Sequence, residues 1–284
     1  MNRIKRSWAL AKASFDVLMK DKELMIFPII SAIAMVIVSA VFFVPTILTN
    51  VLDSIFDTGI PFFGYVVLFL FYLVQYTVVY FFSTALVGAA LIRLRGGDPT
   101  VKDGFDVAKK RIPQILGWAA LSATVGLILN IIKDSSDGKG KGIGSLITNF
   151  LGAAWNVVTF LVVPILAAEG LGPIDAIKRS WELLKRSWGE QVSGTISIGV
   201  VFGLIGFIGS VILIGLGVGL SIAMDTFIPG IIFGVVFIGF ILLVSLLSST
   251  LNGIFTAAVY AYAAEGQVGL FDETTIQGAI QYKN

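Results

Sequence analysis

The sequence predicts an all-α integral membrane protein, and three observations support this fold class. Of the 284 residues, 56% are hydrophobic and only 13% are charged, whereas about 25% of the residues of soluble domains are charged. The charged residues leave six long uncharged runs. Of the 20 Lys and Arg residues, 17 fall in the segments that join these runs on one side. Together these features predict six membrane-spanning helices.

Each uncharged run is long enough to cross a bilayer. About 20 apolar residues span the hydrocarbon core as a helix, and a helix satisfies its own backbone hydrogen bonds there. The runs lack the alternation that is typical of barrel strands. The glycines of Gly215–Gly219 leave open whether the fifth run is one unbroken helix. The runs are residues 24–52, 58–92, 112–132, 142–168, 191–224 and 226–264.

A short motif, "IKRSW", stands at residues 4–8 and again at residues 177–181. Three segments, 3–19, 100–111 and 174–188, share an apolar face with spacing i, i+4, i+7 and i+11. We expect three basic amphipathic helices at the membrane interface, with aromatic rings toward lipid or the spans and lysines toward anionic headgroups. A docking face for a partner protein or a gating lever is the alternative. The predicted membrane-interface residues are Trp8, Phe105, Trp181, Lys5, Lys12, Lys102, Lys109, Lys178 and Lys185.

A second motif marks the end of each repeated unit. "AAEG" closes the fourth span and recurs after the sixth, and the corresponding place after the second span reads "RLRGG". The pattern predicts a single membrane domain, 1–284, built from three parallel pseudo-repeats. Each unit is one amphipathic helix followed by two spans. The units are approximately residues 1–96, 97–170 and 171–266, with a short cytoplasmic tail at 267–284.

The distribution of basic residues predicts the orientation. With six spans, both termini lie on the side that carries 17 of the 20 basic residues. Cytoplasmic loops are enriched in Lys and Arg, so this side is expected to be the cytoplasm. The opposite side holds Lys133, Lys139 and Lys141. We therefore expect a multi-pass protein of the cell (inner, cytoplasmic) membrane with both termini in the cytoplasm.

The repeated motifs carry a family resemblance. "AIKRSWELLKRSW" at residues 176–188, with "AAEG" before it, resembles a broad, mostly uncharacterised class of prokaryotic polytopic membrane proteins. The pattern is similar, at a distance, to the membrane domain that precedes the catalytic domain in some glycerophosphodiester phosphodiesterases. This resemblance implies a fold and transfers no catalytic residue.

The sequence offers no constellation for catalysis. Histidine and cysteine are absent, which excludes the common zinc sites and histidine general bases. The loop "DGKGKGIGS" lacks the Gly-Lys-Ser/Thr of a phosphate-binding loop. We therefore expect no catalytic, cofactor-binding or metal-binding residue and no enzymatic activity. Nucleic-acid binding is not expected, because the basic residues flank membrane spans.

Two residue groups have candidate structural roles. Small residues let membrane helices approach closely, and the expected role of the glycine stripes is packing within the chain, with an oligomer seam or a narrow pathway as alternatives. At the ends of the three units, an arginine and two glutamates are candidates for a rim cluster in which the arginine bridges both acids. Otherwise the arginine is one more cytoplasmic basic residue. The packing glycines are Gly199, Gly203, Gly206, Gly230 and Gly234, and the rim cluster is Arg95, Glu169 and Glu265.

Two functions remain open from the sequence. The first is a non-enzymatic membrane protein that binds lipid, with anionic headgroups as the expected partner, or that organises a membrane complex. The second is a channel or transporter with a pathway between the repeats. An enclosed wet cavity lined by Asn156 and Asn252 would favour the second, and a dry apolar core would favour the first. A protein partner or homo-oligomer is compatible with both.

Overall fold

The chain is described by a computed structural model over residues 3–49, 61–136, 143–187 and 197–266. Within these ranges it is helical and contains no strand, which confirms the all-α prediction. Six stretches are long and apolar enough to cross a membrane by length and composition. They agree with the six predicted spans, and they are Lys22–Pro45, Val66–Leu94, Ile112–Leu129, Phe150–Ala168, Val201–Ala223 and Ile228–Glu265.

Short polar helices alternate with long apolar ones along the chain. The three segments expected to be interface helices are helical: they correspond to α1, α5 and α9. The described elements are α1 (Arg3–Lys20), the 3₁₀ helix η1 (Lys22–Met25), α2 (Ile26–Thr49), α4 (Pro61–Leu94), α5 (Val101–Lys110), α6 (Ile112–Ser136), α7 (Ile143–Val158), α8 (Val162–Ala168), α9 (Pro173–Ser187), α10 (Ser197–Ala223) and α11 (Ile228–Glu265).

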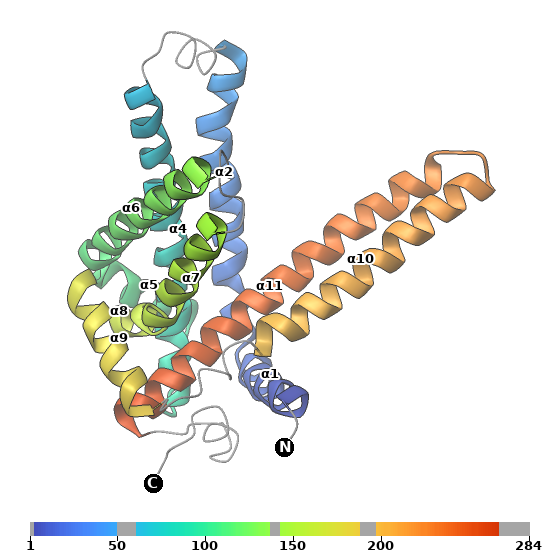
Figure 1. Ribbon diagram of the computed structural model, residues 1–284. Helices are drawn as coiled ribbons and strands as arrows, with labels where there is room; N and C mark the ends of the chain where they lie inside the picture. Colours follow the sequence, from blue (N-terminus) through green and yellow to red (C-terminus); the bar gives the residue numbers. More distant parts are fainter. Residues whose placement is uncertain (1–2, 50–60, 137–142, 188–196, 267–284) are drawn as a thin grey trace.

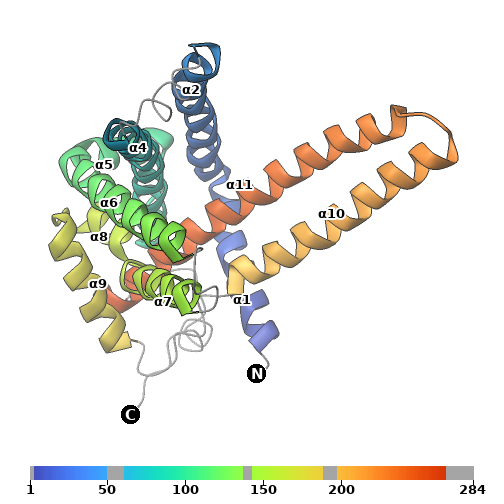
Figure 2. The ribbon, with the colours of Figure 1, turned by 45° about the horizontal axis from the view of Figure 1, so that its top comes forward.

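Helices α10 and α11 form a long hairpin that projects away from the other helices (Figures 1 and 2). Helix α10 runs unbroken from Ser197 to Ala223, so the glycines of the fifth run do not interrupt it. Helix α11 has 38 residues, and at 1.5 Å per residue it is about 57 Å long. The hydrocarbon core is about 30 Å thick. Helix α11 must therefore lie obliquely in a bilayer or extend beyond it.

The fourth span is broken in its middle, between α7 and α8. The chain forms turns at residues 159–161 and then continues as α8. The backbone N–H of Leu161, which starts the second piece, donates a hydrogen bond to Ser180 Oγ at 3.3 Å. Ser180 lies on α9 and is fully buried. A side chain of the next helix thus satisfies a backbone donor that the break exposes.

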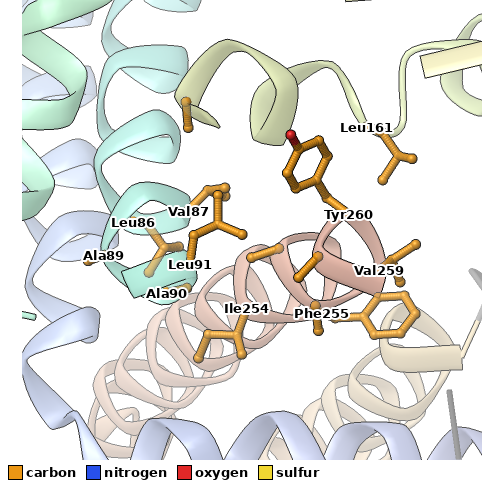
Figure 3. Packing of buried hydrophobic residues seen from close by; sticks show 14 of the residues in the cluster. Leu86, Val87, Ala89, Ala90, Leu91, Leu161, Ile254, Phe255, Val259 and Tyr260 are labelled. Atoms are coloured by element: carbon orange, nitrogen blue, oxygen red, sulfur yellow. The ribbon is translucent and has the colours of Figure 1, made fainter. Parts of the chain in front are cut away.

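The core of the bundle is apolar. It lies where the second half of α4, helix α8 and the C-terminal part of α11 meet (Figure 3). Alanines such as Ala89, Ala90 and Ala257 are almost completely buried there, and small side chains allow close contact between membrane helices.

Helix α5 packs closely against α4. Thr100 and Asp103 form a capping box at its N-terminus, and the hydrogen bond from the Thr100 hydroxyl lowers the pKa of Asp103. Gly104 faces α4, where a Cβ atom would lie 2.7 Å from the carbonyl oxygen of Ala85 and also collide with the ring of Phe27. The Phe27 and Phe105 rings meet edge to face, with centroids 5.3 Å apart. Glycine at 104 thus allows α5 to approach α4.

The five glycines that the sequence assigned to helix packing do not all contact a neighbouring helix. No atom lies within 4 Å of a Cβ built on Gly199, Gly203 or Gly234, so these three positions do not mediate a close helix contact within the described chain. At Gly206 and Gly230 such an atom would contact one side chain. The closest approaches in the hairpin occur instead at Gly209 against Phe240 and at Gly217 against Phe233. A spacing of four residues places glycines on one face but does not say which face meets the partner helix.

Candidate functional site

Charged side chains of α4, α9 and α11 and of the turns beside α1, α4 and α8 form ion pairs near the ends of α4, α8 and α11. We call this region the charged end. One of its ion pairs joins residues that are 170 positions apart in the sequence. Its members are Asp21, Arg93, Arg95, Glu169, Arg179 and Glu265.

Arg95 pairs with Glu265. Arg95 Nε donates to Glu265 Oε2 at 3.1 Å, and Arg95 Nη2 donates to Oε1 of the same carboxylate. These hydrogen bonds raise the pKa of Arg95, because they stabilise its charged form. Two parallel bonds of this kind favour a fixed geometry. The pair therefore ties the end of α4 to the end of α11.

Glu169 has different partners. Arg179 Nε lies 3.2 Å from both of its carboxylate oxygens, and the Tyr260 hydroxyl donates to Glu169 Oε1 at 2.9 Å. Figure 3 shows the Tyr260 side chain rising from α11 toward α8. The expectation that Arg95 bridges both glutamates thus needs correction. Arg95 contacts Glu265, and the α9 arginine neutralises Glu169, because the αL turn after α8 brings α9 back beside it.

Arg93 makes the most buried ion pair of the charged end. Its guanidinium bonds both oxygens of Asp21, and it also reaches Asp98. The side chain of Asp21 is only 8% exposed and that of Arg93 is 19% exposed. This pair could not be predicted from the sequence, because Asp21 stands in a polar segment with no feature to distinguish it. Arg93 therefore joins α4 to the turn before η1 through a largely buried ion pair.

Helices α5 and α9 each have a buried face and an exposed face. Helix α5 buries Gly104 and Ala108, and helix α9 buries Ala176, Ser180 and Leu183. The lysines lie on the opposite, exposed faces of both helices. Exposed lysines are Lys102, Lys109, Lys178 and Lys185.

The three interface aromatics are not equivalent. Phe105 packs inward against Phe27, Phe81 and Phe82. Trp181 is 44% exposed and carries Lys185 Nζ 5.0 Å above its ring, which is a cation–π contact. On α1, Lys12 is exposed, and the side chains of Trp8 and Lys5 lie outside the described side chains. Equal helical spacing therefore leads to different surroundings, because α5 contacts α4 more closely than α9 contacts its neighbours.

A groove runs between α2, α4 and α11 and continues toward α8. Its larger part has a volume of about 320 Å³ and the smaller part about 200 Å³. Both parts are lined by Ser83, Leu86 and Ser249, so they are neighbours. Asn252 lines the smaller part, whereas Asn156 is exposed on α7 and lines neither. We call this region the serine groove; its polar lining residues are Ser31, Ser83, Ser245, Ser249, Asn252 and Thr256.

A glycine in a left-handed backbone conformation follows each of α4, α8 and α11. The φ angles are +89° for Gly96 and +67° for both Gly170 and Gly266. Gly170 is the most constrained, because the guanidinium of Arg111 lies where its Cβ would be. Its carbonyl also accepts a hydrogen bond from Gln114 Nε2 at 3.2 Å.

Replacing Gly170 with alanine is expected to destabilise the protein more than Gly266→Ala. In both variants the alanine must adopt a left-handed backbone conformation, which costs about 1 kcal/mol. Only Gly170→Ala must also displace the Arg111 guanidinium, because nothing lies within 4 Å of a Cβ at Gly266. The extra loss should be small, since the guanidinium is the movable end of a long side chain. Thermal unfolding of both variants in the same detergent measures the difference. Equal shifts in melting temperature would show that the Arg111 contact contributes nothing.

Comparison with known proteins identifies a family over most of the chain. A model described as "Family of unknown function (DUF6159)" matches residues 62–271. No curated protein matches the chain. The matched region includes α4 to α11, and with them the serine groove residues of α4 and α11 and the Arg95–Glu265 pair. This agrees with the resemblance to an uncharacterised class of membrane proteins. Because the match covers more than half of the sequence, the chain belongs to the DUF6159 family of unknown function.

Proposed function

We propose that this chain is a non-enzymatic multi-pass membrane protein that binds lipid, with anionic headgroups held by its basic interfacial helices. The observation that carries the proposal is the two-faced burial of α5 and α9. Each buries small and apolar residues against the bundle and leaves its lysines exposed. Exposed lysines on an interfacial helix attract anionic lipid headgroups.

The triplicated organisation is part of the proposal. Support comes from the left-handed glycines Gly96, Gly170 and Gly266, which end the second apolar stretch of each proposed unit. Further support comes from packing: α5 contacts α4, α9 contacts α8, and α1 contacts α10 and α11. Each short helix thus packs on the closing helix of a unit, and α1 does so with the last unit. A closed three-unit arrangement accounts for these contacts.

The orientation and location are also proposals. The excess of Lys and Arg on the side of the charged end favours a cytoplasmic position for both termini, in the inner membrane of a prokaryotic cell. The distant likeness to phosphodiesterase membrane domains rests on the short repeated motifs alone. A partner protein or a second copy of the chain remains compatible with the lipid-binding proposal.

A pathway for a solute between the repeats is the second candidate. Asn252 and several serines along the serine groove favour it. The apolar core of α4, α8 and α11 favours lipid binding instead, because a polar solute would need polar groups across the whole membrane depth. We therefore retain lipid binding as the primary proposal.

Neutralising Lys102, Lys109 and Lys178 with glutamine is expected to weaken binding of phosphatidylglycerol. The loss is at most about 1 kcal/mol for each lysine. The matched control is Lys133→Gln with Lys139→Gln and Lys141→Gln, which changes the net charge by the same amount in the opposite loop. Native mass spectrometry of protein released from nanodiscs of phosphatidylglycerol and phosphatidylcholine measures the retained lipid. The same loss in both triple variants, or no loss in either, would contradict the proposal.

A further inference from the structure

The serine groove contains polar side chains that lack partners. Ser31, Ser83 and Ser249 make no side-chain hydrogen bond to the described part of the chain, and neither do Ser245 and Asn252. Ser31 is only 9% exposed. In hydrocarbon an unpaired hydroxyl or amide costs free energy, because no water replaces the missing bond.

Several hydroxyl groups elsewhere in the spans donate a hydrogen bond to their own helix. Thr124 donates to the carbonyl of Ala120 at 2.8 Å, and Ser210 donates to that of Gly206 at 2.6 Å. Thr77, Thr159 and Thr250 make the same bond to the residue four positions earlier. The serines of the groove differ from this pattern, and they come from three separate helices. Their convergence on one hollow indicates a ligand with polar atoms.

The groove lies far from the charged end. Ser83 stands eleven residues before Leu94, which is about 16 Å along α4 at 1.5 Å per residue. Asn252 stands thirteen residues before Glu265, about 20 Å along α11. Because the hydrocarbon core is about 30 Å thick, these distances place the serine groove near the middle of the membrane.

The lining contains no charged residue. A phosphate or carboxylate at this depth would have no counter-charge, which disfavours a charged headgroup. Hydroxyl and amide groups instead both donate and accept hydrogen bonds, and they match the hydroxyl and ester carbonyl groups of a neutral lipid. Met35, Phe82 and Leu246 provide apolar walls for its hydrocarbon part.

We propose that the serine groove binds a neutral amphiphile, a lipid whose polar part carries hydroxyl or carbonyl groups and no charge. Ser245 and Ser249 are exposed at the edge of the groove, so the ligand enters sideways from the bilayer. A hollow of about 320 Å³ lies within the size range of small-molecule pockets. One turn of a helix from a second subunit, about 10–12 Å across and about 5.4 Å long, would occupy more than this volume.

Dioctanoylglycerol and dioctanoyl phosphatidic acid provide a matched pair of probes, because they share their acyl chains and differ by one phosphate. Native mass spectrometry of the full chain in mild detergent measures occupancy in a titration with each lipid. We expect one dioctanoylglycerol per chain. Ser249→Leu, which fills the groove from its exposed edge, should lower that affinity tenfold or more and leave phosphatidic acid binding unchanged.

The control is Thr124→Leu, an exposed hydroxyl on α6 that bonds its own helix. It should bind dioctanoylglycerol like the unmodified protein. A double variant, Ser83→Ala with Ser249→Ala, removes two hydroxyls without adding bulk and should also weaken binding about tenfold. This variant keeps the test decisive if Ser249→Leu fails to fold.

Three results would overturn the inference. The first is unchanged dioctanoylglycerol binding in the double alanine variant. The second is an equal loss of phosphatidic acid, which indicates a charged ligand in the groove. The third is a dimer that Ser249→Leu separates, which assigns the groove to a second copy. The lysine variants of the previous section should leave dioctanoylglycerol binding intact, so failure of that proposal is distinguishable from failure of this one.

Discussion

Replacing Arg93 with glutamate is expected to prevent accumulation of folded protein. The change places a third acid beside Asp21 and Asp98, and Asp21 is 8% exposed. Removing one partner of a buried ion pair typically costs about 3–5 kcal/mol, because the remaining charge is desolvated and unpaired. This is a large share of the stability of an ordinary domain. Size-exclusion chromatography of a fluorescent fusion in detergent measures the folded fraction.

The control for this prediction is Lys110→Glu, which reverses one exposed charge at the end of α5. We expect its elution profile to match that of the unmodified protein. A milder double-mutant cycle with Arg93→Gln and Asp21→Asn tests the pair itself, since the double variant should be more stable than the sum of the single losses predicts. Additive effects in that cycle, or a normal profile for Arg93→Glu, would show that the pair is not an anchor. Arg95→Glu should be less harmful, because the side chain of Arg95 is 41% exposed.

Replacing Gly104 with alanine is expected to separate α5 from α4. The added Cβ would collide with the carbonyl oxygen of Ala85, which belongs to the backbone of α4 and cannot rotate aside. Overpacking of this kind costs about 1–3 kcal/mol, more than the gain of up to about 1 kcal/mol that alanine brings in a helix. The melting temperature of the variant in detergent should fall.

Gly203→Ala provides the matched control. Gly203 also lies inside a helix, but nothing stands within 4 Å of its added Cβ. We expect it to leave the melting temperature unchanged or to raise it slightly, because alanine favours the helix. If both alanine variants melt at the same temperature, the close contact of α5 and α4 is not a determinant of stability.

The glycines show why part of the packing could not be predicted. Gly203 belongs to a clear small-residue stripe, whereas Gly104 stands alone in a polar segment. The structure reverses their importance, because only Gly104 faces a neighbouring backbone. Spacing reports which residues share a face of a helix. It does not report how the helix is rotated toward its neighbours.

The ion pairs show the same limit. Arg93 and Arg95 are two residues apart and have the same charge, so the sequence gives no reason to assign them different partners. One pairs with Asp21 and the other with Glu265. Glu169 and Glu265 each stand in an "AAEG" motif, yet Glu169 pairs with an arginine of α9 and Glu265 pairs with Arg95, which directly follows α4. These partners lie on different helices and meet only when the bundle is assembled.

The sequence by itself determined the all-α class, the six candidate spans and the positions of the three short polar helices. These features depend on local properties, because about 20 apolar residues in a row suffice for a span and a helix satisfies its own backbone. Only the tertiary structure decided the Arg93–Asp21 pair, the close contact at Gly104 and the serine groove. Each of these joins segments distant in the chain, and the rotation and tilt of whole helices, set by the sum of many weak packing contacts, determine which side chains meet.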